Sequence, residues 1–168
     1  DFLAQEKGHI FANKQDEILV GKLPATTHNH FYNDKSELHG ELLSLDPFVN
    51  MSWSETGYTS PEIKTQLVGE YNFINFLAAI RIGRFFGISP ENCNQAISEY
   101  QPTNNRSQVT KTDKNTLIVD CYNANPTSMR SALSSFAKID NHAKIFILGD
   151  MREMGDDAPM VHEEVVQQ

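Results

Sequence analysis

The sequence predicts an α/β fold, and three patterns carry that prediction. Residues 28–53 tend towards a period of two, which is typical of strands. Residues 70–87 form one almost continuously apolar stretch of helical length. Residues 116–148 give strand, helix and strand within about thirty residues, which is the length of a βαβ unit in a parallel sheet. We therefore expect antiparallel strands and helices first and a parallel α/β unit afterwards.

Length and composition already exclude several classes of protein. The chain has 168 residues, 39% hydrophobic residues and a formal net charge of −8. This length suits one ordinary domain or parts of two. The acidic balance disfavours general nucleic-acid binding, which needs clustered Lys and Arg. The longest apolar runs have only a few residues, whereas a bilayer span needs about 20, so we predict no membrane insertion. Two cysteines without metal spacing indicate a reducing, cytoplasmic setting.

Short strands are expected to dominate the first 68 residues. Residues 1–7 resemble the end of a helix without a lead-in, so we expect a piece of a longer protein. Residues 9–12 then form a short apolar strand, and residues 16–20 form a brief helix. The strands of residues 28–53 are expected to be antiparallel, and residues 62–68 add one more strand.

Two helices are expected next. The helix of residues 70–87 has almost no polar face, so we expect it to be buried on most sides and to end at Gly87. Ser89 followed by Pro90 is a strong start signal, because Ser caps a helix and Pro suits its first position. The apolar stripe of this second helix consists of Cys93, Ala96, Ile97 and Tyr100.

A polar break at residues 101–105 separates this part from an α/β part. Residues 116–121 and 144–148 are predicted as buried strands, with a helix at residues 126–137 between them. A parallel pair of this kind needs a right-handed crossover. A last helix is expected from about Met160 onward.

Two polar segments follow the two predicted parallel strands. Residues 120–126 come after the first strand and residues 149–155 after the second, and ligands of open parallel sheets bind beyond these strand ends. The carboxylate of Asp120 suits a ribose diol, and the free N–H groups after Pro126 suit an anion. The alternative is that Asp120 and Asn123 only cap the helix at residue 126.

Three further residues are candidates for nucleotide contacts. Arg106 follows the break, where it could reach a phosphate or simply be exposed. Asn72 and Asn75 share one helix face, where their amides would meet an adenine edge or bond internally.

His28 and His30 share a strand face without further ligands at clear spacing, so we predict no metal site. The chain contains no G-x-x-x-x-G-K-[ST] loop, and we assign no catalytic residue to it.

Four segments taken together resemble the Mur ligase family in their order and spacing. These are L-V-G-E-Y-N-F-I-N from residue 67, N-R-S-Q from 105, D-C-Y-N-A-N-P-T-S-M from 120 and L-G-D-M-R-E-M-G from 148. The resemblance implies the C-terminal half of a Mur ligase central ATPase domain at residues 1–102. Residues 103–168 would be the first part of a Rossmann-like C-terminal ligase domain.

The resemblance also implies an activity. The family forms an acyl phosphate from ATP with Mg²⁺, and an amine then attacks it. Here D-alanyl-D-alanine would be added to UDP-N-acetylmuramoyl-tripeptide by a cytoplasmic monomer. The magnesium ligands would lie mostly outside this chain, and we expect the chain alone to be inactive. Alternatives are a ligase similar to folylpolyglutamate or cyanophycin synthetase, or a non-catalytic nucleotide-binding relative.

The resemblance assigns roles to seven residues. Asn75, with Asn72 beside it, would meet adenine, Arg106 would approach the phosphates, and Asp120 would hold the ribose. The incoming dipeptide and the closed cleft would be faced by Asn123, Asn125 and Asp150. Tyr71 departs from the family, which often has His at this position.

Overall fold

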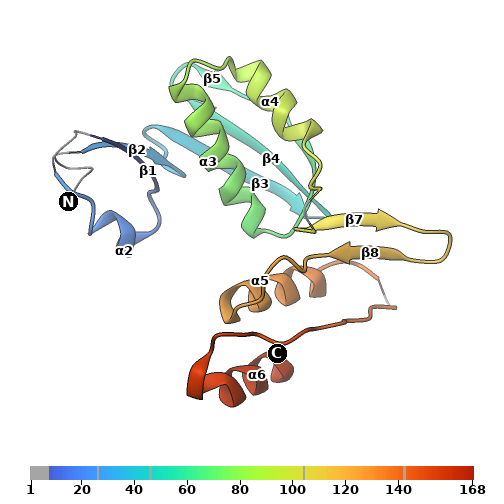
Figure 1. Cartoon of the computed structure of the whole chain (residues 1–168). Helices are drawn as coiled ribbons and strands as arrows, with labels where there is room; N and C mark the ends of the chain where they lie inside the picture. Colours follow the sequence, from blue (N-terminus) through green and yellow to red (C-terminus); the bar gives the residue numbers. More distant parts are fainter. Residues whose placement is uncertain (1–7, 26, 46, 104, 142) are drawn as a thin grey trace.

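The computed structural model describes residues 8–25, 27–45, 47–103, 105–141 and 143–168 (Figure 1). The predicted helix end at residues 1–7 lies outside these ranges. The strands of the structure are β1 (His9–Asn13), β2 (His28–Tyr32), β3 (Leu38–Leu45), β4 (Phe48–Glu55), β5 (Tyr58–Thr59), β6 (Ile63–Val68), β7 (Gln108–Lys111) and β8 (Thr116–Val119). Its α-helices are α2 (Glu17–Val20), α3 (Tyr71–Phe85), α4 (Pro90–Glu99), α5 (Pro126–Ala137) and α6 (Ala158–Gln167).

The first two strands are parallel to each other, with His9 opposite His28. The expectation that all strands around residues 28–53 are antiparallel is therefore wrong for β2. The reason is the connection, because α2 and the loop after it return the chain to the starting end of β1. Parallel neighbours need such a crossover connection, whereas antiparallel neighbours can be joined by a direct hairpin.

The next strands form the predicted antiparallel sheet. β4 pairs with β3, β5 and β6, and all three pairs are antiparallel. Along β4, Val49, Met51 and Trp53 are buried and alternate with less buried residues. This period of two places one face of β4 in the core.

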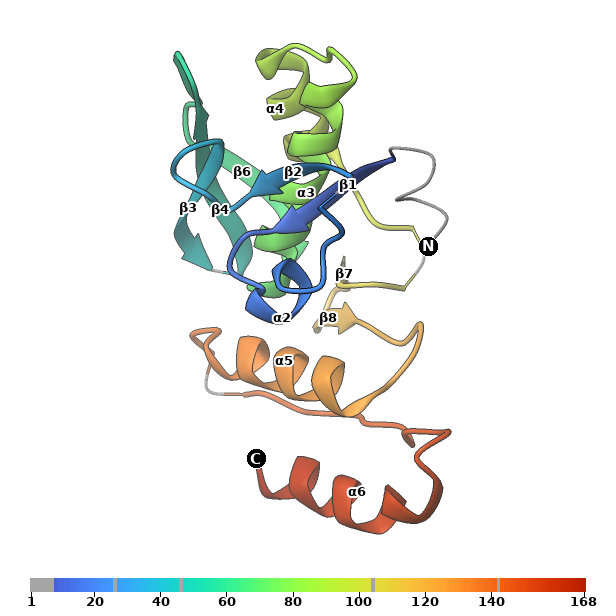
Figure 2. The ribbon, with the colours of Figure 1, turned by 90° about the vertical axis from the view of Figure 1, so that its left-hand side faces the viewer.

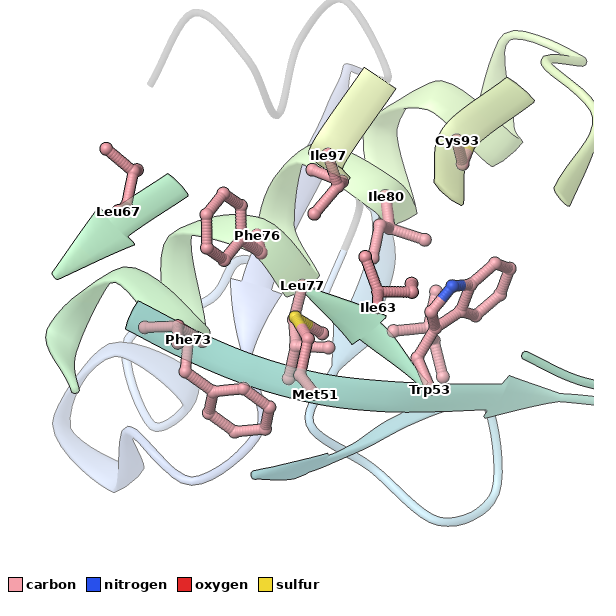
Figure 3. Close-up of a cluster of buried hydrophobic side chains, with 12 residues drawn as sticks. Met51, Trp53, Ile63, Leu67, Phe73, Phe76, Leu77, Ile80, Cys93 and Ile97 are labelled. Carbon is pink, nitrogen blue, oxygen red and sulfur yellow. The ribbon is translucent and has the colours of Figure 1, made fainter. Parts of the chain in front are cut away.

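Helices α3 and α4 cover one face of this sheet (Figures 1 and 2). Leu77 of α3 is fully buried, and its side chain lies beside Met51 of β4 (Figure 3). Gly40 of β3 permits this close approach, because a Cβ there would lie 2.5 Å from Leu77 Cδ2. The core cluster comprises Leu38, Val49, Met51, Trp53, Ile63, Leu67, Phe73, Phe76, Leu77, Ile80, Cys93 and Ile97.

The two helices follow the sequence prediction with three differences. Ser89 caps α4 by accepting a hydrogen bond from the Asn92 N–H at 3.2 Å, as predicted. Burial of α3 is less complete than expected, since Phe85 is 37% exposed and Phe86, just after the helix, is 72% exposed. In α4 only Cys93 and Ile97 of the predicted stripe are buried, since Ala96 is exposed. Tyr100 is 48% exposed and lies beyond the last turn of the helix.

The second part of the chain contains a short hairpin and two helices. β7 and β8 are antiparallel, with Gln108 opposite Val119. Helix α5 has the predicted bounds of residues 126–137, and α6 begins two residues before Met160.

The predicted strand at residues 144–148 is wrong, and with it the parallel βαβ unit. The segment carries no strand pairing, and Ile145 and Ile147 are 81% and 93% exposed. Both views place α5 between β8 and this segment (Figures 1 and 2). Strands must lie about 4.8 Å apart to form ladder hydrogen bonds, which an intervening helix prevents.

No helix within the described ranges combines the length and the apolar character that crossing a membrane requires.

Candidate functional site

A cavity of about 750 Å³ lies where the two parts of the chain meet. The turn between β6 and α3 contributes one wall, and β8 and α5 contribute others. Both predicted segments border it, with Asp120 and Asn123 from one and Asp150 from the other. The structure thus brings these three side chains to one cavity even though the predicted parallel pairing is absent.

The turn that leads into α3 depends on Gly69. Its φ of +95° is in the left-handed region that side chains rarely adopt. A Cβ at this position would also lie 2.5 Å from the Tyr71 ring. Gly69 therefore allows the Tyr71 ring to fold back over the turn, which brings its hydroxyl to the second part of the chain.

The Tyr71 hydroxyl connects Ser107 and Asp120. Tyr71 Oη lies 2.8 Å from Asp120 Oδ2 and 2.6 Å from Ser107 Oγ. Tyr71 has one hydroxyl hydrogen, which it donates to the carboxylate, so the Ser107 hydroxyl donates to Tyr71. The Ser107 N–H adds a bond to Asp120 Oδ1 at 3.3 Å. Both carboxylate oxygens of Asp120 are thereby oriented by the protein.

Burial raises the pKa of Tyr71 to about 12, and the neighbouring Asp120 carboxylate also contributes to this rise. The Ser107 hydrogen bond acts in the opposite direction. Tyr71 consequently keeps its proton at neutral pH and acts as a hydrogen-bond donor.

Asn72 is satisfied inside the protein. Its side chain is buried, and its Nδ2 donates to the Val68 carbonyl at 2.8 Å and to Ser107 Oγ at 3.2 Å. Its Oδ1 accepts from Asn75 Nδ2 at 3.2 Å. The internal-bonding alternative therefore describes Asn72, whereas Asn75 is exposed.

Arg106 is exposed and is held over an aromatic ring. Its guanidinium carbon lies 3.8 Å from the centroid of Tyr122, in a cation–π contact. Its neighbours Asn105 and Ser107 both have positive φ, of 56° and 50°. The Asn105 carbonyl accepts from the Cys121 N–H at 2.9 Å, which ties this bent segment to the end of β8.

Asn125, and not Asp120 or Asn123, caps α5. Its Oδ1 accepts from the Ser128 N–H at 2.9 Å, and Ser128 Oγ accepts from the Asn125 N–H at 3.1 Å. The alternative that Asp120 and Asn123 only cap this helix is therefore wrong. Asn123 instead accepts from the Ala124 N–H at 2.9 Å and is exposed at the cavity.

Asp150 is exposed in a loop whose next residue is anchored. Met151 is 4% exposed, and its N–H donates to His162 Nε2 at 3.0 Å.

Sequence reasoning missed the contributions of Ser107, Tyr122 and His162. These contacts join residues 11 or more positions apart, and hydrophobic periodicity carries no signal for them.

Among the residues that the structure describes, no group of three or more His, Cys, Asp or Glu side chains is placed to hold a metal ion. His30 Nε2 instead lies 2.8 Å from His9 Nδ1, which is a hydrogen-bond distance.

Comparison with known proteins places these features in a family. Residues 105–168 match the family model described as Mur ligase, glutamate ligase domain. The UDP-N-acetylmuramoyl-tripeptide–D-alanyl-D-alanine ligase of Bacillus subtilis (strain 168) is 38% identical over 160 residues, which covers 90% of this chain and 35% of the relative. The enzyme of the same name from Treponema pallidum (strain Nichols) is 36% identical over 173 residues, covering 97% and 37%.

The solved structures agree in fold. The crystal structure of MurF ligase from Thermotoga maritima in complex with ADP has a TM-score of 0.79 at 15% identity, covering 95% of this chain and 37% of that one. The chain spans about a third of the length of these relatives. Similarity of sequence through both parts, together with this shared fold, shows that the chain belongs to the Mur ligase family.

Proposed function

We propose that the protein containing this chain is an ATP-dependent ligase that adds D-alanyl-D-alanine to UDP-N-acetylmuramoyl-tripeptide, a step in making peptidoglycan precursors. The observation that carries the proposal is the 36–38% identity to two ligases of that name over 90–97% of this chain. We also propose that the protein is a monomer of the cytoplasm.

The nucleotide side of the proposed site centres on Asp120. Each of its carboxylate oxygens accepts one protein hydrogen bond and keeps lone-pair capacity for the two hydroxyls of a ribose. Exposed Asn75 offers its amide to an adenine edge, and a hydrogen bond from its Nδ2 to Asn72 Oδ1 orients it. Exposed Arg106, steadied on Tyr122, supplies positive charge for the phosphates.

The acceptor side consists of Asn123 and Asp150, which border the same cavity. D-Alanyl-D-alanine carries an ammonium group, for which the Asp150 carboxylate is a suitable partner. Asn125 contributes indirectly, because its cap fixes the start of α5 next to Asn123. Its side-chain oxygen is already used in this cap.

The chemistry that the family performs needs an activated carboxyl group. ATP phosphorylates the tripeptide carboxylate, and the dipeptide amine then displaces phosphate to form the amide. Mg²⁺, when bound, neutralises phosphate charge in such reactions. We expect its ligands to lie mostly outside this chain, whose part is to bind nucleotide and to orient the dipeptide.

Phosphate release by the full-length protein tests the activity. We expect release with ATP, Mg²⁺ and UDP-N-acetylmuramoyl-tripeptide to depend on added D-alanyl-D-alanine, while the 168-residue chain alone releases none. A folded full-length protein that binds ATP but releases no phosphate with the dipeptide would overturn the proposal. Release with glutamate in place of the dipeptide would favour a folylpolyglutamate-type ligase instead.

Two Asp→Asn variants test the ribose contact. Asp120→Asn removes charge from the oriented acceptor, and we expect ATP affinity to fall about 10-fold or more, as for other hydrogen bonds to charged groups. Asp113→Asn alters an exposed acid between β7 and β8 and serves as the control. Equal ATP affinity in both variants would show that Asp120 does not contact the nucleotide.

A further inference from the structure

His162 connects helix α6 to the loop that carries Asp150. Its Nε2 accepts from the Met151 N–H at 3.0 Å, and its Nδ1 lies 2.7 Å from the Ala158 carbonyl oxygen. A backbone N–H can only donate and a carbonyl can only accept. The two contacts therefore fit one state of the ring, a neutral imidazole with its hydrogen on Nδ1.

The Ala158 contact is an ordinary one within a helix, because the two residues are four positions apart. The Met151 contact is different, since it spans 11 residues and reaches out of the helix. It anchors the loop through its backbone at the residue whose side chain is also buried. The preceding residue, Asp150, is left exposed at the cavity.

The loop returns to α6 through a tight bend. Glu153 and Gly155 have φ of 65° and 57°, and a short 3₁₀ turn at Gly155–Asp157 leads into α6. The bend places His162, in the second turn of α6, back against Met151. Loop and helix thus form one closed unit.

Helix α6 is in turn fixed to α5. Arg130 and Glu164 form an ion pair at 2.9 Å, and the Gln168 side chain donates to Ser134 Oγ at 2.9 Å. Helix α5 begins at Pro126, three residues after Asn123, which borders the same cavity. His162 therefore connects the pair of helices α5 and α6 to the loop that carries Asp150. This connection determines the position of Asp150 relative to Asn123.

We propose that His162 is a positioning residue for the acceptor: by holding the Met151 N–H it fixes Asp150 at the cavity for the incoming dipeptide. This inference rests on the proposed function for the identity of the acceptor. The link itself, between His162 and Met151, rests only on the geometry.

Two substitutions separate the two hydrogen bonds of the ring. In His162→Asn the side-chain nitrogen takes the place of Nδ1 and keeps the Ala158 bond, but nothing reaches Met151. In His162→Gln the side-chain oxygen takes the place of Nε2 and keeps the Met151 bond. The variants are therefore matched in polarity and differ in the contact to the loop.

Kinetics of the full-length protein give the first readout. We expect His162→Asn to raise the KM for D-alanyl-D-alanine about 5- to 10-fold, the usual effect of one hydrogen bond, with the KM for ATP unchanged. His162→Gln should stay within about twofold of the parent. Equal effects of the two variants, or a parallel change in the KM for ATP, would overturn the proposal.

Hydrogen exchange of the same proteins gives a readout that does not need activity. The peptide containing Met151 should exchange faster in His162→Asn than in the parent, and it should stay protected in His162→Gln. Unchanged protection in His162→Asn would disprove the link. If the parent shows no dipeptide-dependent turnover while exchange behaves as expected, the proposed function fails and the link between His162 and the loop stands.

Discussion

Two regions of this chain bury their apolar side chains to very different extents. The packed region, residues 38–99, contains all twelve residues of the core cluster (Figure 3). The open region, residues 105–168, has among its described residues only Met151 and Val165 as buried apolar side chains. Its larger apolar residues are exposed instead, including Leu117, Ile145, Phe146, Ile147 and Leu148.

The packed region supplies most of the buried apolar area, whereas the open region supplies most of the residues that line the cavity. Packing of α3 and α4 on the antiparallel sheet supplies the buried area that drives folding. The open region is fixed by polar contacts instead, such as the cap at Asn125 and the bonds of His162. Regions with few buried apolar contacts open at low free-energy cost, so we expect the open region to unfold locally more easily than the packed region. Four substitutions test whether the two regions differ in this way.

The largest effect is expected from Leu77→Ala in the packed region. Leu77 is fully buried, so truncation should leave a cavity and lower the free energy of unfolding by about 2–5 kcal/mol. Ile147→Ala in the open region is the control, since Ile147 is 93% exposed and the change should stay within about 0.5 kcal/mol. Urea unfolding followed by fluorescence of Trp53, the single tryptophan, measures both. Similar losses in the two variants would contradict the comparison.

A glycine pair should give the next largest difference. In Gly40→Ala the new methyl group would lie 2.5 Å from Leu77 Cδ2 and 2.8 Å from Phe73 Cζ, and overpacking of this kind costs about 1–3 kcal/mol. Gly149→Ala meets no atom within 4 Å and should be close to neutral. Thermal unfolding followed by circular dichroism and Trp53 fluorescence compares them. A Gly40→Ala variant as stable as the parent would mean that β3 and α3 can move apart without a loss of folding stability.

Sequence reasoning located the packed region well because its signals are local. The period of two along β4 and the Ser89–Pro90 start of α4 each depend on neighbouring residues, and both are confirmed. It placed helix α5 correctly for the same reason. It failed at residues 144–148, where an apolar run of strand length has no strand partner. An apolar run shows that a segment suits burial, but pairing depends on what lies beside it.

For the candidate site, sequence reasoning named some of the residues that lie at the cavity, and their roles stay predictions. The motif residues Asp120, Asn123 and Asp150 do border one cavity. The contacts that orient them come from Tyr71, Ser107 and His162, which meet them only through the fold. Asn125 shows the converse, because a motif residue that resemblance assigned to the substrate forms a helix cap. Its assignment to the dipeptide stays a prediction, as does the boundary near residue 102.

A smaller effect is expected from pH at the edge of the packed region, where His30 of β2 faces Arg81 of α3. Burial lowers the pKa of His30, as do Arg81, His9 and His28, while Glu37 opposes them. The unfolded chain then binds a proton more readily than the folded one. The resulting stability is present above the unfolded value of about 6.5 and is lost as pH falls through the lower folded value. Unfolding midpoints at pH 7.5 and 5.5 should differ less in His30→Gln than in the parent, and equal differences would exclude His30 as the source.

The smallest effect is expected from the ion pair between α5 and α6. Arg130 and Glu164 are 48% and 50% exposed, so Glu164→Gln should cost only about 0.2–1 kcal/mol and less at high salt. Glu37→Gln, which removes the charged partner of Arg81 in the packed region, should cost more, because Glu37 is only 32% exposed and accepts from both Arg81 and the Phe31 N–H. Denaturant unfolding at 0.05 M and 1 M salt separates the two. If Glu164→Gln proved the costlier change, the exposed ion pair of the open region would stabilise the protein more than the less exposed one does, and the comparison of the two regions would fail.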